Sequence, residues 1–277
     1  MMYLILAICC STAISILMRL SEKHSRSAMG MLATNYLACA LLAAAYTGPR
    51  QLFPAQEGMG LTLALGAVGG ILYLGGFVLM RWNISRNGVV LPSTFMKLGV
   101  IVPTALSILV FGETPRLMQV IGIGMALLAI FLMHEKSGKG SVSIPGLVVL
   151  MLCGGSSDAL SKVFEEIGPA ALKDHFLLYI FIMALLACTA LCLLQRQKPD
   201  RMDLLFGLAI GVPNYYAARF LLLSLESVPA MIAYPCFSVG TIVLVAVLGV
   251  ICFRERLSRR KLEALLVILA ALILLNV

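Results

Sequence analysis

Charged residues are scarce in this chain. Only 12% of its 277 residues are charged, 61% are hydrophobic, and the mean hydropathy is +1.00. Soluble domains average about a quarter charged and about half apolar residues, so this composition excludes an ordinary soluble domain. A chain this apolar is not disordered either. We therefore predict an integral membrane protein with the lipid bilayer as its surroundings.

Motifs for enzyme, nucleotide and metal chemistry are also lacking. The chain has no GxxxxGK[ST] loop and no CxxC pair, and His134-Glu135 lacks the second histidine of a metalloprotease helix. The eight cysteines all fall inside apolar runs, where they are interpreted as packing residues. We predict no catalytic residues, no metal, no cofactor and no nucleic-acid partner.

Ten apolar windows are present, each bounded by charged residues, Gly or Pro. They cover about 3–20, 28–47, 60–80, 88–111, 116–133, 143–164, 173–194, 203–224, 229–252 and 261–276. Helices are the expected structure, because a backbone in hydrocarbon must satisfy its own hydrogen bonds. Glycines concentrated in the window 60–80 indicate close helix packing.

The second half of the chain repeats the first. A shift of 143 residues pairs Arg19 with Lys162, Glu22 with Glu165, Tyr73 with Tyr216 and Pro92 with Pro235, and a one-residue adjustment pairs Glu113 with Glu255. Each half, 1–134 and 143–277, holds five windows, an odd number, so the halves should enter the membrane in opposite directions. The predicted fold is all-α, with ten transmembrane helices as two inverted five-helix repeats.

Short stretches at equivalent places carry a family resemblance. Phe111-Gly112-Glu113, Phe253-Arg254-Glu255, and a Gly-Gly-Ser-Ser stretch followed by Lys162 resemble the drug/metabolite transporter superfamily in its EamA-like, ten-helix form. The first window departs from the pattern, since it carries Cys-Ser-Thr where Trp-Gly is often found. The resemblance spans essentially the whole chain. It implies a secondary transporter whose midplane cavity is lined by the first, third, fourth, sixth, eighth and ninth windows.

Lys97 lies about ten residues into the window 88–111, too deep to reach the membrane surface easily. Ser93, Lys97 and Thr104 share one helix face. A charge at this depth is expensive. Either Lys97 pairs with a buried carboxylate for packing, or it faces a substrate cavity.

Arg219 forms a second polar set with Asn214 and Tyr215 in the window 203–224. It could reach the membrane surface, pair with Glu226, or face inward. In the last case two cations from opposite halves would meet and favour a carboxylate or phosphate.

Asp158 is the acidic residue expected at greatest depth. It is a candidate proton or coupling site, a counter-ion to Lys97 or Arg219, or an i, i+4 partner of Lys162.

The remaining candidates follow from the repeat and from the expected lining. Tyr73, Tyr216, Tyr234, Ser238 and Thr12 are predicted to line the substrate site, with aromatic packing as the alternative for the tyrosine pair Tyr73 and Tyr216. Pro92 and Pro235 are candidate hinges, unless each lies harmlessly in a first helical turn.

The loops after the odd-numbered windows hold 15 of the 21 Lys and Arg residues, and the opposite side holds four. The positive-inside rule then places both termini outside the cell membrane, which we expect to be a bacterial inner membrane. The duplicated halves allow a self-sufficient monomer, and a homodimer stays open.

The predicted function is secondary active transport, as an exporter or exchanger, by alternating access. The expected substrate is a small polar metabolite, anionic or zwitterionic, such as an amino acid, a carboxylate or a phosphorylated compound. The alternatives are a flippase for a lipid or lipid-linked phosphate, an organic-cation or drug exporter, and a membrane scaffold that transports nothing.

Overall fold

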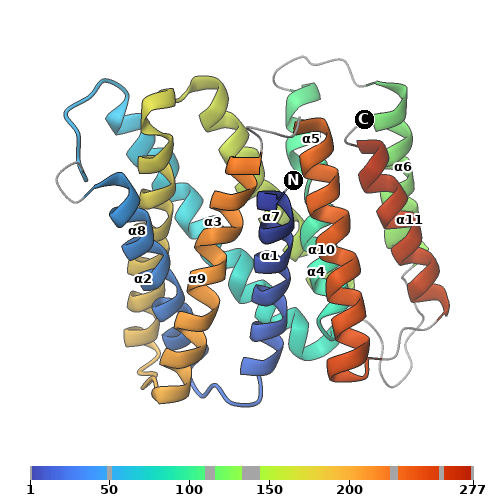
Figure 1. Ribbon diagram of the computed structural model, residues 1–277, viewed down its shortest axis with the longest axis horizontal. Helices are drawn as coiled ribbons and strands as arrows, with labels where there is room; N and C mark the ends of the chain where they lie inside the picture. Colours follow the sequence, from blue (N-terminus) through green and yellow to red (C-terminus); the bar gives the residue numbers. More distant parts are fainter. Residues whose placement is uncertain are drawn as a thin grey trace.

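The computed structural model is a bundle of helices that describes residues 2–48, 52–109, 116–132, 144–224, 230–255 and 259–275 (Figure 1). The helices are α1 (Met2–Ser21), α2 (Ala28–Thr47), α3 (Met59–Asn87), α4 (Val90–Leu98), α5 (Ile101–Leu109), α6 (Leu117–Leu132), α7 (Ile144–Ile167), the short 3-10 helix η2 (Ala170–Leu172), α8 (Lys173–Leu194), α9 (Arg201–Ser224), α10 (Ala230–Phe253) and α11 (Arg259–Leu275). Within these residues, seven helices are long and apolar enough to cross a membrane. The prediction of an all-helical membrane protein is confirmed.

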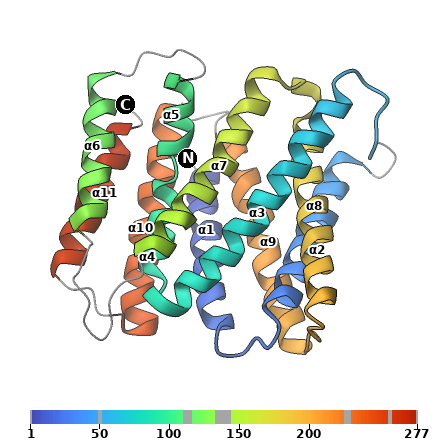
Figure 2. The same ribbon diagram turned by 180° about the vertical axis from the view of Figure 1, so that it is seen from behind.

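Two helix pairs flank a central group of helices. Figures 1 and 2 show α2 beside α8 at one end of the bundle and α6 beside α11 at the other, and both pairs are in contact. Between them lie α1, α3, α4, α5, α7, α9 and α10. The central helices are those whose windows were expected to line the cavity.

The contacts keep their pattern when the two halves of the chain are exchanged. Helix α1 packs on α9 and α10, while α7 packs on α3 and on the α4–α5 pair. Helix α2 packs on α9, while α8 packs on α3. This is the pattern expected of a bundle with an internal two-fold axis.

The window 88–111 was expected to be one helix, and this was wrong: it contains α4 and α5. The Gly99 amide donates to the Met96 carbonyl at 3.3 Å and the Val102 amide to the Gly99 carbonyl at 2.9 Å, a tighter winding than an α-helix. Pro103 has no amide hydrogen with which to restore the regular bond to Gly99. A Cβ on Gly99 would lie 2.9 Å from the Met151 carbonyl of α7, so the junction also packs closely.

The predicted hinge Pro92 lies in the first turn of α4, where a missing amide hydrogen removes no helical bond. The interruption in this span lies instead at Gly99 and Val100, two residues beyond Lys97. Pro235 lies within α10, and its side chain is outside the described residues.

Glycines let α3 approach α8 closely. A Cβ on Gly70 would lie 2.6 Å from the Ile180 carbonyl oxygen and 2.9 Å from the Ala184 amide nitrogen, which are backbone atoms that cannot move aside easily. Gly76, also buried in α3, has no such neighbour within 4 Å. The small residues of the third window therefore act in helix packing, as predicted, though not all of them equally.

Gly70→Ala is expected to destabilise the protein by about 1–3 kcal/mol through overpacking against α8. The matched change Gly76→Ala should leave stability unchanged or raise it, since alanine favours a helix by about 1 kcal/mol over glycine. Thermal unfolding of the detergent-purified variants measures both. Equal melting temperatures for the two variants would contradict the packing described here.

Candidate functional site

Lys97 lies in the middle of the bundle, near the end of α4. Its side chain is partly buried, and its Nζ lies 3.8 Å from the centre of the Phe237 ring of α10. An ammonium held against an aromatic face is attracted by the electron density of the ring. The contact joins the two halves of the chain, because α4 belongs to the first half and α10 to the second.

Asp158 lies on α7 within electrostatic reach of Lys97 and Tyr73. The Asp158 side chain is exposed although α7 packs against α3, α4 and α5. This exposure indicates an opening beside Asp158, which is here called the hollow. The ion pairs between described residues join Arg19 to Glu22, Arg19 to Glu255 and Arg26 to Asp200, and none of them joins Lys97 to Asp158.

Tyr73 connects this hollow to a buried hydrogen-bond network. Its hydroxyl donates to Oδ1 of Asn214 at 3.2 Å, and Nδ2 of Asn214 donates to Oδ1 of Asn35 at 3.2 Å. The Tyr36 hydroxyl donates to the Tyr73 carbonyl at 3.2 Å. These bonds join α2, α3 and α9. The bond from the Tyr73 hydroxyl to Asn214 fixes the orientation of the Tyr73 side chain.

Arg219 belongs to a separate group near the end of α9. Its Cζ lies 3.6 Å from the centre of the Tyr46 ring, and Nη1 donates to the Tyr215 hydroxyl at 3.4 Å. The Tyr216 ring lies 5.2 Å from that of Phe220. Among the described contacts, none joins Arg219 to Lys97, so the structure does not bring the two cations together. Glu226, the alternative partner, lies outside the described residues.

Of the other residues singled out in the sequence, Ser93, Thr12 and Ser238 have described side chains. Ser93 on α4 donates to Ser15 on α1 at 3.0 Å, directly below Lys97 on the same helix face. Thr12 is buried, and its hydroxyl has no hydrogen-bond partner among the described atoms. Ser238 is half-buried on α10. The side chains of Tyr234, Thr104 and Lys162 lie outside the described residues.

Phe237 is the site residue that the sequence analysis missed. One turn of helix separates it from Thr241, whose hydroxyl bonds back to the Phe237 carbonyl at 2.7 Å. An aromatic residue in an apolar window gives no signal by itself. Metal ligation finds no support in the described part of the chain, where no three His, Cys, Asp or Glu side chains gather.

Lys97→Met is expected to leave the stability of the ligand-free protein within about 1 kcal/mol of wild type, or to raise it. The change removes a poorly compensated charge from the bundle, which stabilises the protein. It also removes one cation–π contact, whose loss destabilises the protein by a similar amount. The neighbouring change Leu98→Ala, at a fully buried apolar side chain, should lower stability by about 2–5 kcal/mol. If Lys97→Met melted as low as Leu98→Ala, Lys97 would be a structural residue.

Comparisons with known proteins agree on the fold and the family. A protein of Haemophilus influenzae, described as uncharacterized, is 25% identical over 273 residues, which cover 92% of this chain and 91% of the relative. A solved crystal structure, 14% identical, superposes with a TM-score of 0.64 over 99% of this chain and 95% of its own, which shows the likeness of the folds. The profile of the EamA-like transporter family matches residues 1–134 and again 143–277. The chain therefore belongs to the EamA-like transporter family, whose members are membrane transporters and not enzymes.

Proposed function

We propose that the chain is a secondary active transporter that moves a small polar metabolite by alternating access around the hollow beside Lys97 and Asp158. The observation that carries this proposal is the placement of the Lys97 ammonium on the Phe237 ring of the other half of the chain, within electrostatic reach of Asp158. Charged groups at this depth are expensive and mark functional sites in membrane proteins. The expected substrate is anionic or zwitterionic.

Each side chain at the hollow has a proposed role. Lys97 binds the carboxylate or phosphate of the substrate as a point charge. Phe237 and Tyr73 form walls, and Tyr73 is oriented by Asn214. Asp158 holds a substrate ammonium or a proton. Because Asp158 interacts with Lys97 in the empty protein, an anionic substrate on Lys97 would weaken that interaction and change the proton affinity of Asp158.

The two halves, 1–134 and 143–277, are proposed to be inverted five-helix repeats. The exchange symmetry of the contacts supports this, as do the two separate matches to the family profile. Lys97 on α4 comes from the first half, and Asp158 on α7 and Phe237 on α10 come from the second. A site built from both halves would be rearranged whenever the halves move relative to each other.

The Arg219 group is proposed to act along the path to the hollow. Arg219, Tyr46, Tyr215 and Tyr216 lie toward the ends of α2 and α9, at the edge opposite the basic loops. Arg219 would attract an anionic substrate, and the tyrosine rings would form the walls of the path.

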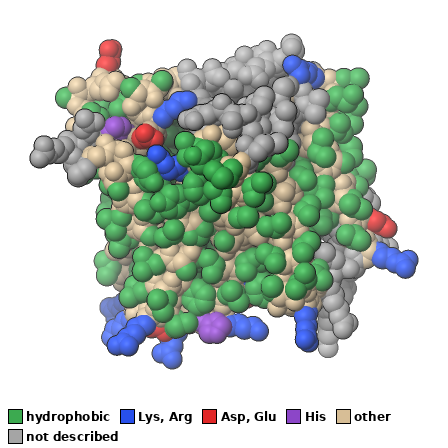
Figure 3. Space-filling view, viewed as in Figure 1, with side chains coloured by type: hydrophobic (Ala, Val, Ile, Leu, Met, Phe, Trp, Pro, Cys, Tyr) green, Lys and Arg blue, Asp and Glu red, His purple; other side chains and the backbone are tan. Residues whose placement is uncertain are grey.

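The orientation is proposed from the charge distribution. The loops after α1, α3 and α8 and the end of α10 lie at the lower edge in Figure 1, and both termini lie above it. Figure 3 shows an apolar band across the molecule with Lys and Arg side chains gathered along the same lower edge. By the positive-inside rule this edge faces the cytoplasm of a bacterial cell, and both termini face outward.

The proposal is tested by ligand-induced thermal stabilisation of the detergent-purified protein, screened against small carboxylates, phosphorylated compounds, zwitterions and organic cations. A ligand at 100 times its Kd should stabilise the folded protein by about 2.7 kcal/mol. We expect an anionic or zwitterionic ligand to do so and Lys97→Met to abolish the effect. Lys23→Met, which removes an exposed lysine on the basic edge, is the matched control and should respond as wild type.

Stabilisation by organic cations that persists in Lys97→Met and is lost in Asp158→Asn would contradict the anionic site and favour an organic-cation exporter. Stabilisation by phospholipid alone, lost in Lys97→Met, would favour a flippase.

A further inference from the structure

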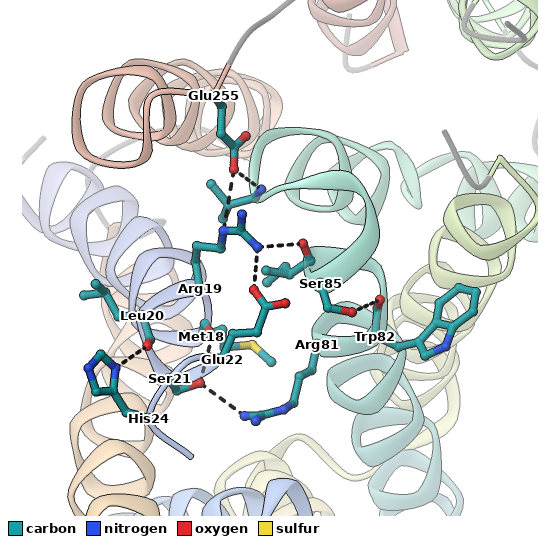
Figure 4. A network of polar contacts seen from close by, with 12 residues as sticks. Met18, Arg19, Leu20, Ser21, Glu22, His24, Arg81, Trp82, Ser85 and Glu255 are labelled. Carbon is teal, nitrogen blue, oxygen red and sulfur yellow. Dashed lines mark hydrogen bonds and ion pairs between the residues drawn. The ribbon is translucent and has the colours of Figure 1, made fainter. Parts of the chain in front are cut away.

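A carboxylate from the second half of the chain caps a helix of the first half. The Val89 amide donates to Oε1 of Glu255 at 2.6 Å, and the Val90 amide donates to Oε2 at 3.4 Å. Glu255 follows the end of α10, and Val89 and Val90 begin α4. In Figure 4 the Glu255 carboxylate lies between the end of α10 and the start of the helix opposite.

The start of α4 has no capping side chain of its own, so the cap comes from a residue distant in the sequence. The N-cap position is Val89, whose side chain cannot accept a hydrogen bond, and the first amides of any helix lack partners within it. A negative charge at a helix N-terminus also interacts favourably with the helix dipole. Glu255 supplies both, and its side chain is only 11% exposed.

Arg19 at the end of α1 adds a third element to this contact. Its Nε lies 3.9 Å from Oε1 of Glu255, and its guanidinium also pairs with Glu22 and donates to the Ile84 carbonyl at 3.1 Å. Figure 4 shows Arg19 at the centre of these bonds. The ends of α1, α3 and α10 and the start of α4 are thereby held together at the basic edge of the bundle.

The backbone around Glu255 is shaped for this contact. Arg254 has a φ of +53°, which is uncommon for a residue other than glycine, and it turns the chain so that Glu255 points back toward α4. Gly88, with a φ of +77°, lies against the carboxylate, and a Cβ there would come within 2.6 Å of it. A side chain at position 88 would displace Glu255.

These residues lie between the hollow and the basic edge of the bundle. Along α4, Lys97 is followed toward that edge by Ser93, which bonds to Ser15 of α1, and then by Val90 and Val89. The helices involved, α1, α4 and α10, also carry Thr12, Lys97 and Phe237. Contacts that hold these helices together therefore lie between Lys97 and this edge.

We propose that Glu255, with Arg19 and the Val89 and Val90 amides, is a latch that keeps the basic side of the transporter closed and opens when the halves move apart. This rests on the proposed alternating access. The helix amides and the charges lie at the membrane edge, where water can replace Glu255 once it leaves. A contact that stayed closed permanently would not need water to replace Glu255.

Hydrogen exchange in the full-length protein, followed by mass spectrometry, tests this without a substrate. Glu255→Gln removes the charge, so exchange should become about tenfold faster in peptides covering residues 84–98 and 249–255. Opening one side should close the other, so exchange should become slower at the ends of α7 and α9. Glu263→Gln, which removes an exposed carboxylate of α11, should change neither region.

Faster exchange confined to the basic edge, or no change, would overturn the latch. If Glu255→Gln does not fold, the same hydrogen-exchange measurement is made on Arg19→Gln, which leaves the Glu255 cap on α4 in place. The same faster exchange at the basic edge and slower exchange at the opposite edge are then expected. Misfolding of both variants would show a static brace and would also overturn the proposal. None of these outcomes depends on ligand binding at Lys97, so the transport proposal stands or fails separately.

Discussion

The energetic penalty for holding Lys97 and Asp158 inside an apolar bundle is the constraint on which the rest of the structure depends. Neither group is neutralised by a direct bridge between described residues, so each needs partial compensation from its surroundings. Phe237 supplies some of this for Lys97, and the Asp158 side chain is exposed and not enclosed by apolar groups. A site that is incompletely satisfied when empty is well suited to bind a ligand that carries the missing charge.

The bundle combines tightly packed helices with one helical span that is interrupted. Helix α3 meets α8 through Gly66 and Gly70, where close backbone contact leaves little room for sliding. The span that carries Lys97, in contrast, is interrupted at Gly99 and Val100, and Glu255 from the other half of the chain caps its first amides. The corresponding helix of the second half, α10, runs without a break from Ala230 to Phe253. The two halves share one pattern of contacts and differ in the span that carries Lys97.

The sequence predicted the helices well and the contacts of the side chains less well. Hydrophobic windows located most long helices within about three residues, because the bilayer sets both helix length and polarity. The window 60–80 was too short, since α3 continues to Asn87 through its polar last turns. The break after Lys97 was missed, since an apolar Gly-Val pair before a proline looks the same in a straight helix. Lys97 and Asp158 were found because charge in an apolar run is conspicuous. Phe237 was missed for the opposite reason, and the separation of Arg219 from Lys97 depends on helix rotation, which periodicity within one helix does not fix.

Transport by reconstituted protein would test the central claim most directly. The measurement is counterflow of a radiolabelled ligand, chosen by its thermal stabilisation, into proteoliposomes that hold wild type, Lys97→Met, Asp158→Asn or the control Lys23→Met. The account predicts uptake by wild type and Lys23→Met and none by the two variants of the central pair. Uptake that persists unchanged in Lys97→Met and Asp158→Asn would contradict it, because the substrate would then cross the membrane without using the hollow between them.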